Sequence, residues 1–434
     1  MKGESDIKFS EMRENMSDCP AVVIEPECKR MKPDVLMEMG LAMLDDEDEP
    51  VSAGDSQNSS NSPFDVTETS LLCNVNEEVS SFTDPFGDDY TLYRKQKSIG
   101  RTREDYFRNL SDEIVLNIFK WLPKKTLNRC SLVCRRWRNI ARDEVLWTRL
   151  DLGSKTLSPG SLADVVKTGV RILRLAQADI PDPVFGNEVF PEDYVSRLQF
   201  LDLSMTVISV QGLVSLLTKT KHLVKLSLEH CSINDEVCEA ISQNRQLEVL
   251  NLAMVYDLTT TGLLTILSSC RRLVGLNLGW TGLKTESLDC LMSCLPPNLS
   301  QLNLSGVRFD LLDKHVAQLV TACPKLSELD ISDATNITAT SIDLLKKLAN
   351  LEHLSISRCY KISNSPSVVQ QLAAIPSLRY LDLFGLVSDK NIVGLRRNLP
   401  TMKINKFVFS SIARPTVGIR RTSIWGLRSR DCRD

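Results

Sequence analysis

Leu247-Glu-Val-Leu250-Asn-Leu252, followed by Leu273-Val-Gly-Leu276-Asn-Leu278, is the stretch of sequence that decides the fold. Each copy has apolar residues at its first, fourth and sixth positions. The alternation at the end of each copy predicts a short strand with one buried face. About a dozen residues after each copy comes a helical stretch, such as residues 262–267, which we expect to pack on the outer side of the strand.

Eleven copies of this pattern occupy residues 147–409, and their starts lie 23 to 28 residues apart. That period is typical of leucine-rich repeats. Each unit buries its apolar face only against its neighbours, so we predict a curved α/β solenoid of about ten repeats over residues 151–409. The copies begin at Trp147, Val170, Leu198, Leu223, Leu247, Leu273, Leu299, Leu326, Leu351, Leu378 and Ile404.

Residues 105–150 have a helical pattern instead. Ser111 precedes two acidic residues, which suit the first turn of a helix. Apolar residues then recur at helical spacing until Pro123, and a second helical run covers residues 127–141. Three helices in so few residues make too small a core to be stable alone. We therefore expect this module to share its apolar surface with a partner.

The charges of the chain are segregated. Residues 1–100 carry 22 acidic and 9 basic side chains, whereas the rest carries 33 acidic and 43 basic ones. The polar, acidic composition predicts that residues 1–104 form a disordered arm. Within it, residues 35–44 form either a docking element for a partner groove or a simple apolar patch. The basic junction at residues 94–103 is either a nuclear-import signal or a solvated linker.

Several classes of protein are excluded by composition. No apolar run approaches the ~18 residues of a membrane span, and the first thirty residues lack the apolar stretch of a secretory signal. We therefore expect a soluble intracellular protein without a membrane partner, whose 13 cysteines are reduced thiols.

Catalytic and metal-binding patterns are missing from the sequence. There is no phosphate-binding glycine loop, nucleophile elbow or His-Glu-x-x-His motif, so we expect no enzyme, no cofactor and no catalytic residue. His230 and Cys231 could donate to a metal. However, Cys231, Cys270, Cys323 and Cys359 recur at fixed places in the repeat, which favours small buried thiols over metal ligands.

The inner face of the solenoid is the expected binding surface. Small polar residues between the apolar pair form a lane on which we expect a ligand polypeptide to lie flat. Large residues follow the late strands, namely Trp280, Arg308, Asp333, Arg358 and Tyr360. These types often anchor interfaces, although a random scatter on a solvated face is the alternative. The lane comprises Asp202, Ser227, Asn251, Asn277, Asn303, Asp330, Ser355 and Asp382.

After residue 409 the repeat stops. Residues 410–434 carry six Arg against two Asp, together with apolar residues such as Ile412 and Trp425. We expect this tail to fold back on the solenoid with Trp425 buried. Binding of nucleic acid by the basic tail is the alternative, but it lacks the interleaved aromatic residues that stack on bases.

The helical module resembles the F-box, which binds the adaptor subunit of SCF (Skp–cullin–F-box) ubiquitin ligases. The resemblance lies in Leu110-Ser-Asp-Glu113, Ile118-Phe119-Lys-Trp-Leu122-Pro123 and Leu132-Val133-Cys134-Arg135-Arg136-Trp137. Ser111 stands where the motif usually has Pro, and we expect it still to cap the helix. The resemblance implies ten adaptor-binding residues: Leu110, Ile114, Ile118, Phe119, Leu122, Pro123, Val133, Cys134, Trp137 and Trp147.

An F-box followed by repeats resembles the leucine-rich-repeat class of F-box proteins. Within it, Leu276-Asn-Leu-Gly-Trp280 and Ile412-Ala-Arg-Pro-Thr-Val-Gly418 are similar to the S-phase kinase-associated family. That resemblance implies recruitment of phosphorylated inhibitors of cyclin-dependent kinases, helped by the CKS accessory protein. It implies that Trp280, Arg308, Asp330, Asp333, Arg358 and Tyr360 face CKS and substrate, completed by Arg414, Pro415 and Trp425 in the tail.

The function expected from these patterns is that of a non-catalytic substrate receptor, which joins cullin through the adaptor and acts in nucleus and cytoplasm. The arm is a candidate contact for a cyclin–kinase. One rival function is a non-degradative scaffold whose F-box binds the adaptor but delivers no substrate. A blocker similar to ribonuclease inhibitor needs only the solenoid and leaves the F-box unexplained.

Overall fold

The computed structural model describes residues 106–362, 371–372, 374–416 and 423–429. The predicted disordered arm therefore lies outside the described residues, and so do its segment 35–44 and the basic junction at 94–103. Within the described ranges, no helix is both long enough and apolar enough to cross a membrane.

A small helical module opens the described chain. It contains two 3-10 helices, η3 (Tyr106–Asn109) and η4 (Glu144–Trp147), and three α-helices, α3 (Asp112–Phe119), α4 (Lys124–Ser131) and α5 (Arg135–Ala141). Its core is built around Val115, Phe119 and Leu127, all almost fully buried. Ser111 occupies the N-cap position of α3, but contrary to expectation its side chain makes no cap hydrogen bond.

The second helical run is broken, which the periodicity did not predict. The chain leaves the helix after α4, and Cys134 is extended (φ −159°) before α5 begins. Its sulfur accepts a hydrogen bond from Trp137 N at 3.5 Å and so caps α5. Because of this break, Leu132 and Val133 point away from the core and are 56% and 64% exposed.

A parallel sheet of 11 strands follows, in which the described strands pair in chain order from β1 to β11. Most strands consist of three residues around a central leucine, which is buried because it faces the helices. This confirms the predicted fold class, a helical module followed by a leucine-rich-repeat solenoid. The strands are β1 (Arg149–Asp151), β2 (Ile172–Arg174), β3 (Phe200–Asp202), β4 (Lys225–Ser227), β5 (Val249–Asn251), β6 (Gly275–Asn277), β7 (Gln301–Asn303), β8 (Glu328–Asp330), β9 (His353–Ser355), β10 (Tyr380–Asp382) and β11 (Lys403–Ile404).

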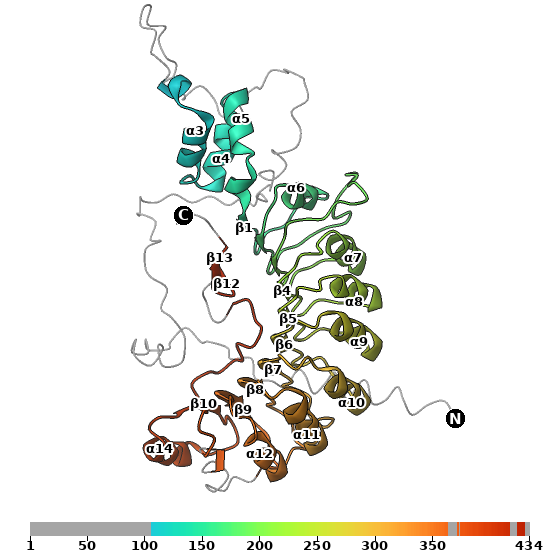
Figure 1. Cartoon of the computed structure of the whole chain (residues 1–434), viewed down its shortest axis with the longest axis vertical. Helices are drawn as coiled ribbons and strands as arrows, with labels where there is room; N and C mark the ends of the chain where they lie inside the picture. The colour runs from blue at the N-terminus through green and yellow to red at the C-terminus, as the bar shows by residue number, and fades with distance from the viewer. Residues whose placement is uncertain (1–105, 363–370, 373, 417–422, 430–434) are drawn as a thin grey trace, which may run out of the picture. The chain divides into compact units, whose positions relative to one another are not determined.

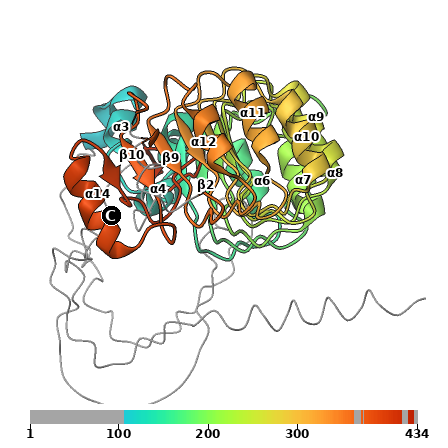
Figure 2. The same cartoon turned by 90° about the horizontal axis from the view of Figure 1, so that it is seen from below.

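The helices form a second layer on the outer side of the sheet (Figure 1). Seen from below, α7–α11 overlap as a stack on one side (Figure 2). Leucine, isoleucine and valine side chains from both layers make one continuous core along the solenoid. The helices are α6 (Ser161–Lys167), α7 (Val210–Thr218), α8 (Asp235–Ser242), α9 (Thr260–Ser269), α10 (Thr285–Cys294), α11 (Asp313–Ala322), α12 (Ala339–Leu345) and α14 (Asp389–Asn398).

The register of the last repeat differs from the prediction. Ile404 pairs with Leu381 and so occupies the central strand position that we had assigned to Phe407. Phe407 instead packs its ring against His353 and Tyr380, each at 5.3 Å between ring centroids. Phe409 is 73% exposed, so the predicted eleventh copy at 404–409 is wrong.

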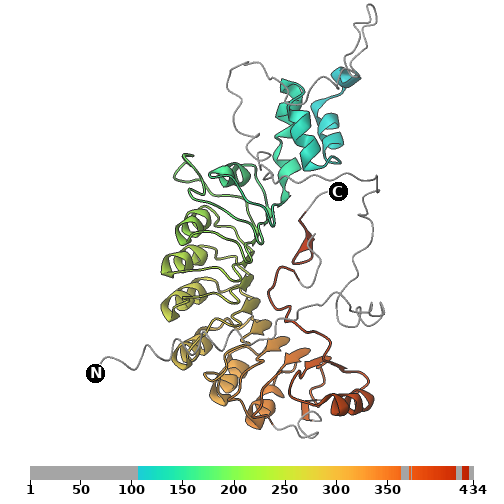
Figure 3. The same cartoon turned by 180° about the vertical axis from the view of Figure 1, so that it is seen from behind.

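The chain after β11 turns back along the inner face of the sheet, the face opposite the helices. Figure 3 shows this segment and its short hairpin, β12 (Ser423–Ile424) and β13 (Leu427–Arg428), facing the early strands. β12 and β13 pair with each other in antiparallel fashion and do not join the large sheet.

Candidate protein-interaction surface

The helical module presents an apolar face to solvent. Ile114 and Ile118 lie one turn apart on the outer side of α3 and are 49% and 40% exposed. Leu132 and Val133 add to the exposed apolar surface at the α4–α5 break. Exposed side chains of this size, close together on one small module, are typical of a protein-binding surface. We call these four residues the apolar face of the module.

The ten residues predicted to bind the adaptor occupy three kinds of place. Ile114, Ile118, Val133 and Cys134 are exposed, whereas Leu110, Leu122, Pro123 and Trp137 are partly buried. Phe119 and Trp147 are core residues, and they can influence a partner only through the fold. Leu132 was missed, because helical periodicity assigned it to an unbroken helix.

Trp137 supports the module from within. Its indole makes edge-to-face contacts with Phe107 at 5.0 Å and with Phe119 at 5.3 Å between ring centroids. Such contacts stabilise small cores, so removal of the ring would disturb the fold as well as any interface.

A row of left-handed residues lines the edge of the sheet at which the strands end. In each repeat it lies two residues after the last apolar position, with φ between 56° and 81°. The N–H of each row residue from Ser154 to Arg358 donates to a carbonyl of the next repeat, as from Trp280 to Ser305 at 2.7 Å. Side chains in this row therefore project from one edge in consecutive repeats. The row comprises Ser154, Gln177, Met205, His230, Met254, Trp280, Gly306, Asp333, Arg358 and Gly385.

Two pairs of predicted site residues lie at the late part of this row, one held by stacking and one by an ion pair. The guanidinium of Arg308 lies 5.5 Å from the ring centroid of Trp280. The Nε and Nη2 of Arg358 each donate to the carboxylate of Asp333 at 2.6 Å. These hydrogen bonds raise the pKa of the Arg358 guanidinium. Tyr360 is 64% exposed two residues after Arg358.

Two glycines make room for these pairs. A Cβ on Gly306 would lie 2.4 Å from Cδ2 of Trp280, so the indole rests directly on the glycine backbone. A Cβ on Gly385 would lie 3.0 Å from Cγ of Arg358 in the same way. Each large side chain thus covers the glycine of the following repeat.

The lane of small polar residues is not open, contrary to expectation. Asp202, Asn251 and Asn277 are fully buried. Each uses its Oδ1 to accept the N–H two residues later, as Asn277 does from Gly279 at 3.0 Å. These bonds shape the turn that leads into the left-handed row. The lane therefore shapes the repeats and is not the open surface that we expected.

Asp330 is also unavailable as a direct contact. It is 6% exposed, and burial raises the pKa of its carboxyl. Ser332 N donates to it at 2.9 Å, and the side chain of Ser410 in the tail also bonds to it. The tail thus contacts Asp330, one of the six residues predicted to face CKS and substrate. Asp333, another of the six, is also buried.

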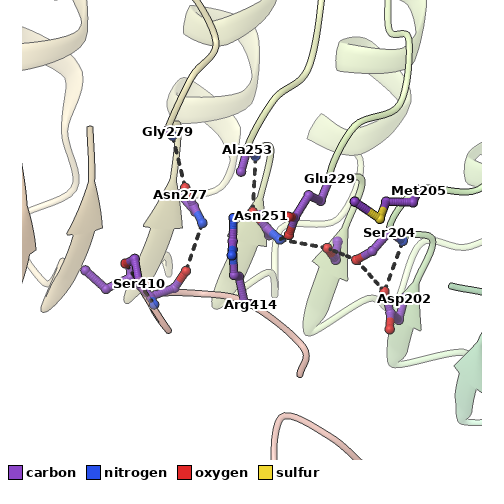
Figure 4. Close-up of polar contacts among 12 residues, drawn as sticks. Asp202, Ser204, Met205, Glu229, Asn251, Ala253, Asn277, Gly279, Ser410 and Arg414 are labelled. Carbon is purple, nitrogen blue, oxygen red and sulfur yellow. Dashed lines mark hydrogen bonds and ion pairs between the residues drawn. The ribbon is translucent and has the colours of Figure 1, made fainter. Parts of the chain in front are cut away.

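The tail occupies the inner face, held by polar side chains of the sheet (Figure 4). The Nδ2 of Asn277 donates to the carbonyl of Ile412 at 3.0 Å. Two residues later, Nη2 of Arg414 forms an ion pair with Glu229 at 3.1 Å. The Nδ2 of Asn251 donates to the same Glu229 carboxylate at 2.9 Å, which orients it toward the arginine.

Trp425 closes over this anchored segment. Its indole Nε1 donates to the carbonyl of Ala413 at 3.1 Å. Its backbone N–H donates to the carbonyl of Pro415, which is buried. It packs against a cluster of Val249, Ile412 and Ala413 but remains partly exposed, so the expected burial of Trp425 is only partial.

The tail reaches as far as the first strand. The hydroxyl of Ser429 bonds to Oδ2 of Asp151 at 3.4 Å, and Arg149 donates to the carbonyl of Arg428 at 3.2 Å. The described tail thus contacts residues from β8 back to β1.

The recurring cysteines are buried thiols that hydrogen-bond to neighbouring repeats. Cys231 donates to Leu203 O at 3.2 Å, and Cys359 makes the equivalent bond to Ile331 O at 3.3 Å. Burial raises the pKa of Cys231, Cys270, Cys323 and Cys359 to about 12, so these thiols stay protonated. Across the described ranges, no three His, Cys, Asp or Glu side chains gather as a metal site.

Comparison with known protein families identifies both the helical module and the repeats. A model of the F-box-like domain matches residues 108–153, and the repeats follow it directly. The chain is therefore an F-box leucine-rich-repeat protein by class. A second model, described as the SKP2 LRR domain, matches residues 160–432. Because that match covers more than half of the chain, the protein belongs to the SKP2 LRR domain family.

Individual relatives are more distant. The chain is 25% identical over 269 residues to lysine-specific demethylase 2B of Mus musculus, which covers 58% of this chain and 18% of that protein. It is 44% identical over 52 residues to F-box/WD repeat-containing protein 8 of Homo sapiens, covering 12% and 9%. The chain thus spans about a fifth of the length of its demethylase relatives, or less.

A solved structure gives a partial likeness. The yeast Rad7–Elc1 complex contains a chain with 18% identity and a TM-score of 0.36, and the match covers 68% of this chain and 92% of that one.

Proposed function

We propose that this protein is the substrate-recognition subunit of an SCF ubiquitin ligase. The observation that carries the proposal is the combination of an F-box-like module, whose apolar face is exposed, with the SKP2-type repeat domain. The apolar face of the module binds an SCF adaptor, which links the chain to cullin. The chain itself transfers no ubiquitin.

The adaptor contact follows from the exposure of the module. Burial of Ile114, Ile118, Leu132 and Val133 against a partner would be favourable, since burial of apolar surface contributes about 25 cal/mol per Å². The hydrophobic surface that they leave exposed is one that a small module cannot cover by itself. An adaptor groove lined with apolar residues is the complementary surface.

The substrate contact lies along the late left-handed row. Trp280 with Arg308 forms one exposed anchor, and Arg358, held by the buried Asp333, forms a second. Tryptophan and arginine are the residues that most often dominate binding energy. The substrates are phosphorylated cell-cycle regulators such as inhibitors of cyclin-dependent kinases.

Phosphate recognition requires help from a second protein. The fork of Arg358 is already engaged by Asp333, so it offers few free donors to a phosphate. The CKS accessory protein supplies the phosphate-binding residues, and this chain supplies the adjoining surface. Binding then raises the effective concentration of substrate lysines near the ubiquitin-charged enzyme in nucleus and cytoplasm.

The adaptor contact is tested by substitution of exposed residues only. Val133→Asp and Ile118→Asp should abolish co-purification of the adaptor by placing a charge in an apolar interface. Val393→Asp, on the exposed side of α14, is the matched control and should leave co-purification unchanged. Retention of the adaptor by both module variants would show that this face is not the interface. Trp137→Ala is unsuitable, because Trp137 also supports the fold.

The substrate contact is tested by capture of a phosphopeptide. Trp280→Ala should reduce capture from a CKS-containing complex at least tenfold, whereas adaptor binding persists. Equal capture by the variant and the parent would refute the placement of the site. If Ile118→Asp loses the adaptor but no protein accumulates in cells that express this variant, the chain is a non-degradative scaffold.

A further inference from the structure

A second charged surface lies at the opposite edge of the sheet, where the chain enters the strands. Lys221, Arg245 and Arg271 each stand four residues before a strand, in the turns that join α7 to β4, α8 to β5 and α9 to β6. His222 and Arg272 follow directly in the first and third of these turns. All five side chains are exposed. We call these five residues the cationic row.

The strand register aligns the members of the row. Lys225 pairs with Val249, and Val249 pairs with Gly275, so the residues four places earlier occupy equivalent positions. At about 4.8 Å between neighbouring strands, three successive turns span on the order of 10 Å.

Hydrogen bonds between the turns hold this alignment. The Oδ1 of Asn244 accepts from Leu223 N at 2.8 Å, which ties the first turn to the second. The thiol of Cys270 donates to Asn244 O at 3.5 Å, which ties the third turn to the second. The cations therefore project from a fixed backbone, and a ligand would find them already in line.

The row is largely unneutralised. Among the residues that the structure describes, Lys221, Arg245 and Arg272 have no ion-pair partner, and Arg271 donates only to the carbonyl of Cys294. By contrast, Arg197 in the preceding turn pairs with Glu144. One exposed acid, Glu248, lies three residues after Arg245 and cannot balance four permanent cations.

Helix dipoles alone do not explain the row. Cations after a helix C-terminus are favourable, and each of these turns follows a helix. However, the equivalent positions after α10 and α11 are Pro297 and Pro324. At the position four residues before the strand, cations therefore occur in three adjacent repeats and not after α10 or α11. Arg197 and Lys325 occupy the next position in other repeats, but Arg197 pairs with Glu144 and Lys325 donates to Asn298.

We propose that the cationic row is a docking site for an acidic polypeptide segment, rich in Asp and Glu, of a partner protein. An extended segment advances about 3.4 Å per residue, so four or five residues span the row. Several carboxylates then meet several exposed cations across a preformed line, with no need for a pocket.

The features of the row favour a peptide over a nucleic acid. No Phe, Tyr or Trp occurs at the row positions, whereas sequence-tolerant binding of single strands relies on aromatic stacking. A length of about 10 Å is also short for a duplex, since proteins that bind duplexes by charge contact six to ten phosphates.

The test uses the full chain and fluorescence anisotropy with a labelled ten-residue poly-glutamate peptide. The triple variant Lys221→Gln, Arg245→Gln, Arg272→Gln removes three exposed ion pairs between the row and the peptide. Each pair contributes a factor of about two in affinity, so the variant should bind the peptide about tenfold more weakly. The charge-matched control is Lys347→Gln, Lys390→Gln, Arg397→Gln, and its binding should stay within twofold of the parent.

Three results would overturn the proposal. One is failure of the parent chain to bind poly-glutamate more tightly than poly-glutamine at low salt. Another is equal binding by the parent and the triple variant when both have the same thermal midpoint. A third is tighter, row-dependent binding of an oligonucleotide of equal charge, which would assign the row to nucleic acid.

Discussion

The contact between Gly306 and Trp280 leads to a sharp prediction. Gly306→Ala adds a single methyl group at a position where the backbone has φ +81°. The added Cβ would lie 2.4 Å from Cδ2 and 2.8 Å from Cε3 of the indole. Favourable contact between carbon atoms begins near 3.5 Å, so the indole must move by about 1 Å or more.

The cost can be divided into two parts. A left-handed backbone costs a residue with a Cβ about 1–2 kcal/mol. Displacement of the indole adds loss of the stacked Arg308, about 0.5–1 kcal/mol at an exposed site. It also adds roughly 50 Å² of lost apolar contact, about 1 kcal/mol. Gly306→Ala should therefore lower the free energy of unfolding by about 3 kcal/mol.

Gly282→Ala isolates the second part. Gly282 has φ +68° and no atom within 4 Å of an added Cβ, so its substitution costs only the backbone strain. Urea unfolding followed by far-UV circular dichroism should place Gly306→Ala about 1.5–2 kcal/mol below Gly282→Ala. A difference under about 0.5 kcal/mol would refute the conclusion that the indole rests on Gly306. Capture of phosphopeptide should also fall in Gly306→Ala alone.

Three further predictions concern the inner face. Arg414→Ala removes a half-buried ion pair worth about 1 kcal/mol, so the tail should open more often and chymotrypsin should cleave after Trp425 about fivefold faster. The side chain of Arg428 is exposed, so the control Arg428→Ala should not change the rate of cleavage. Asp202→Asn should raise stability to urea at pH 7, because burial raises the pKa of Asp202. The penalty for the charged carboxylate is complete at a pH above the pKa of Asp202 in the folded state, and it disappears at a pH well below 3.8. The gain in stability from Asp202→Asn should therefore be smaller at pH 4 than at pH 7. A gain that stays constant with pH would contradict this explanation, and Asn251→Asp should lower stability at pH 7.

The repeat was predictable because its signal is periodic. Ten of the eleven central positions, from Leu150 to Leu381, lie at the centres of strands as expected. The eleventh failed because Phe407 and Phe409 imitate the apolar spacing, although they belong to the chain that has already left the sheet. Periodicity states which residues are apolar, and it does not state which of them find a neighbouring repeat to cover them.

Two properties of the site could not be read from periodicity. The break before Cys134 depends on one extended residue, and a helical pattern continues across it without a visible change. Asp202 and Asn277 are buried in the turns that they bond, and the tail also contacts Asn277. Alternation placed these side chains correctly on the inner face, but contacts between residues far apart in the chain decided their exposure.

The course of the tail also has a consequence for the synthesis of the chain. Its anchors run from Ser410, beside β8, to Ser429, beside β1, so the cover of the early strands is synthesised after all the strands that it contacts. Until then, Val249 and the carboxylate of Glu229 lack the residues that cover them. A chain that stops before Ile412 leaves Val249 and Glu229 without this cover. The tail therefore makes the cover of this strip depend on synthesis beyond the last repeat, since a chain that ends within the repeats exposes the strip to chaperones and proteases.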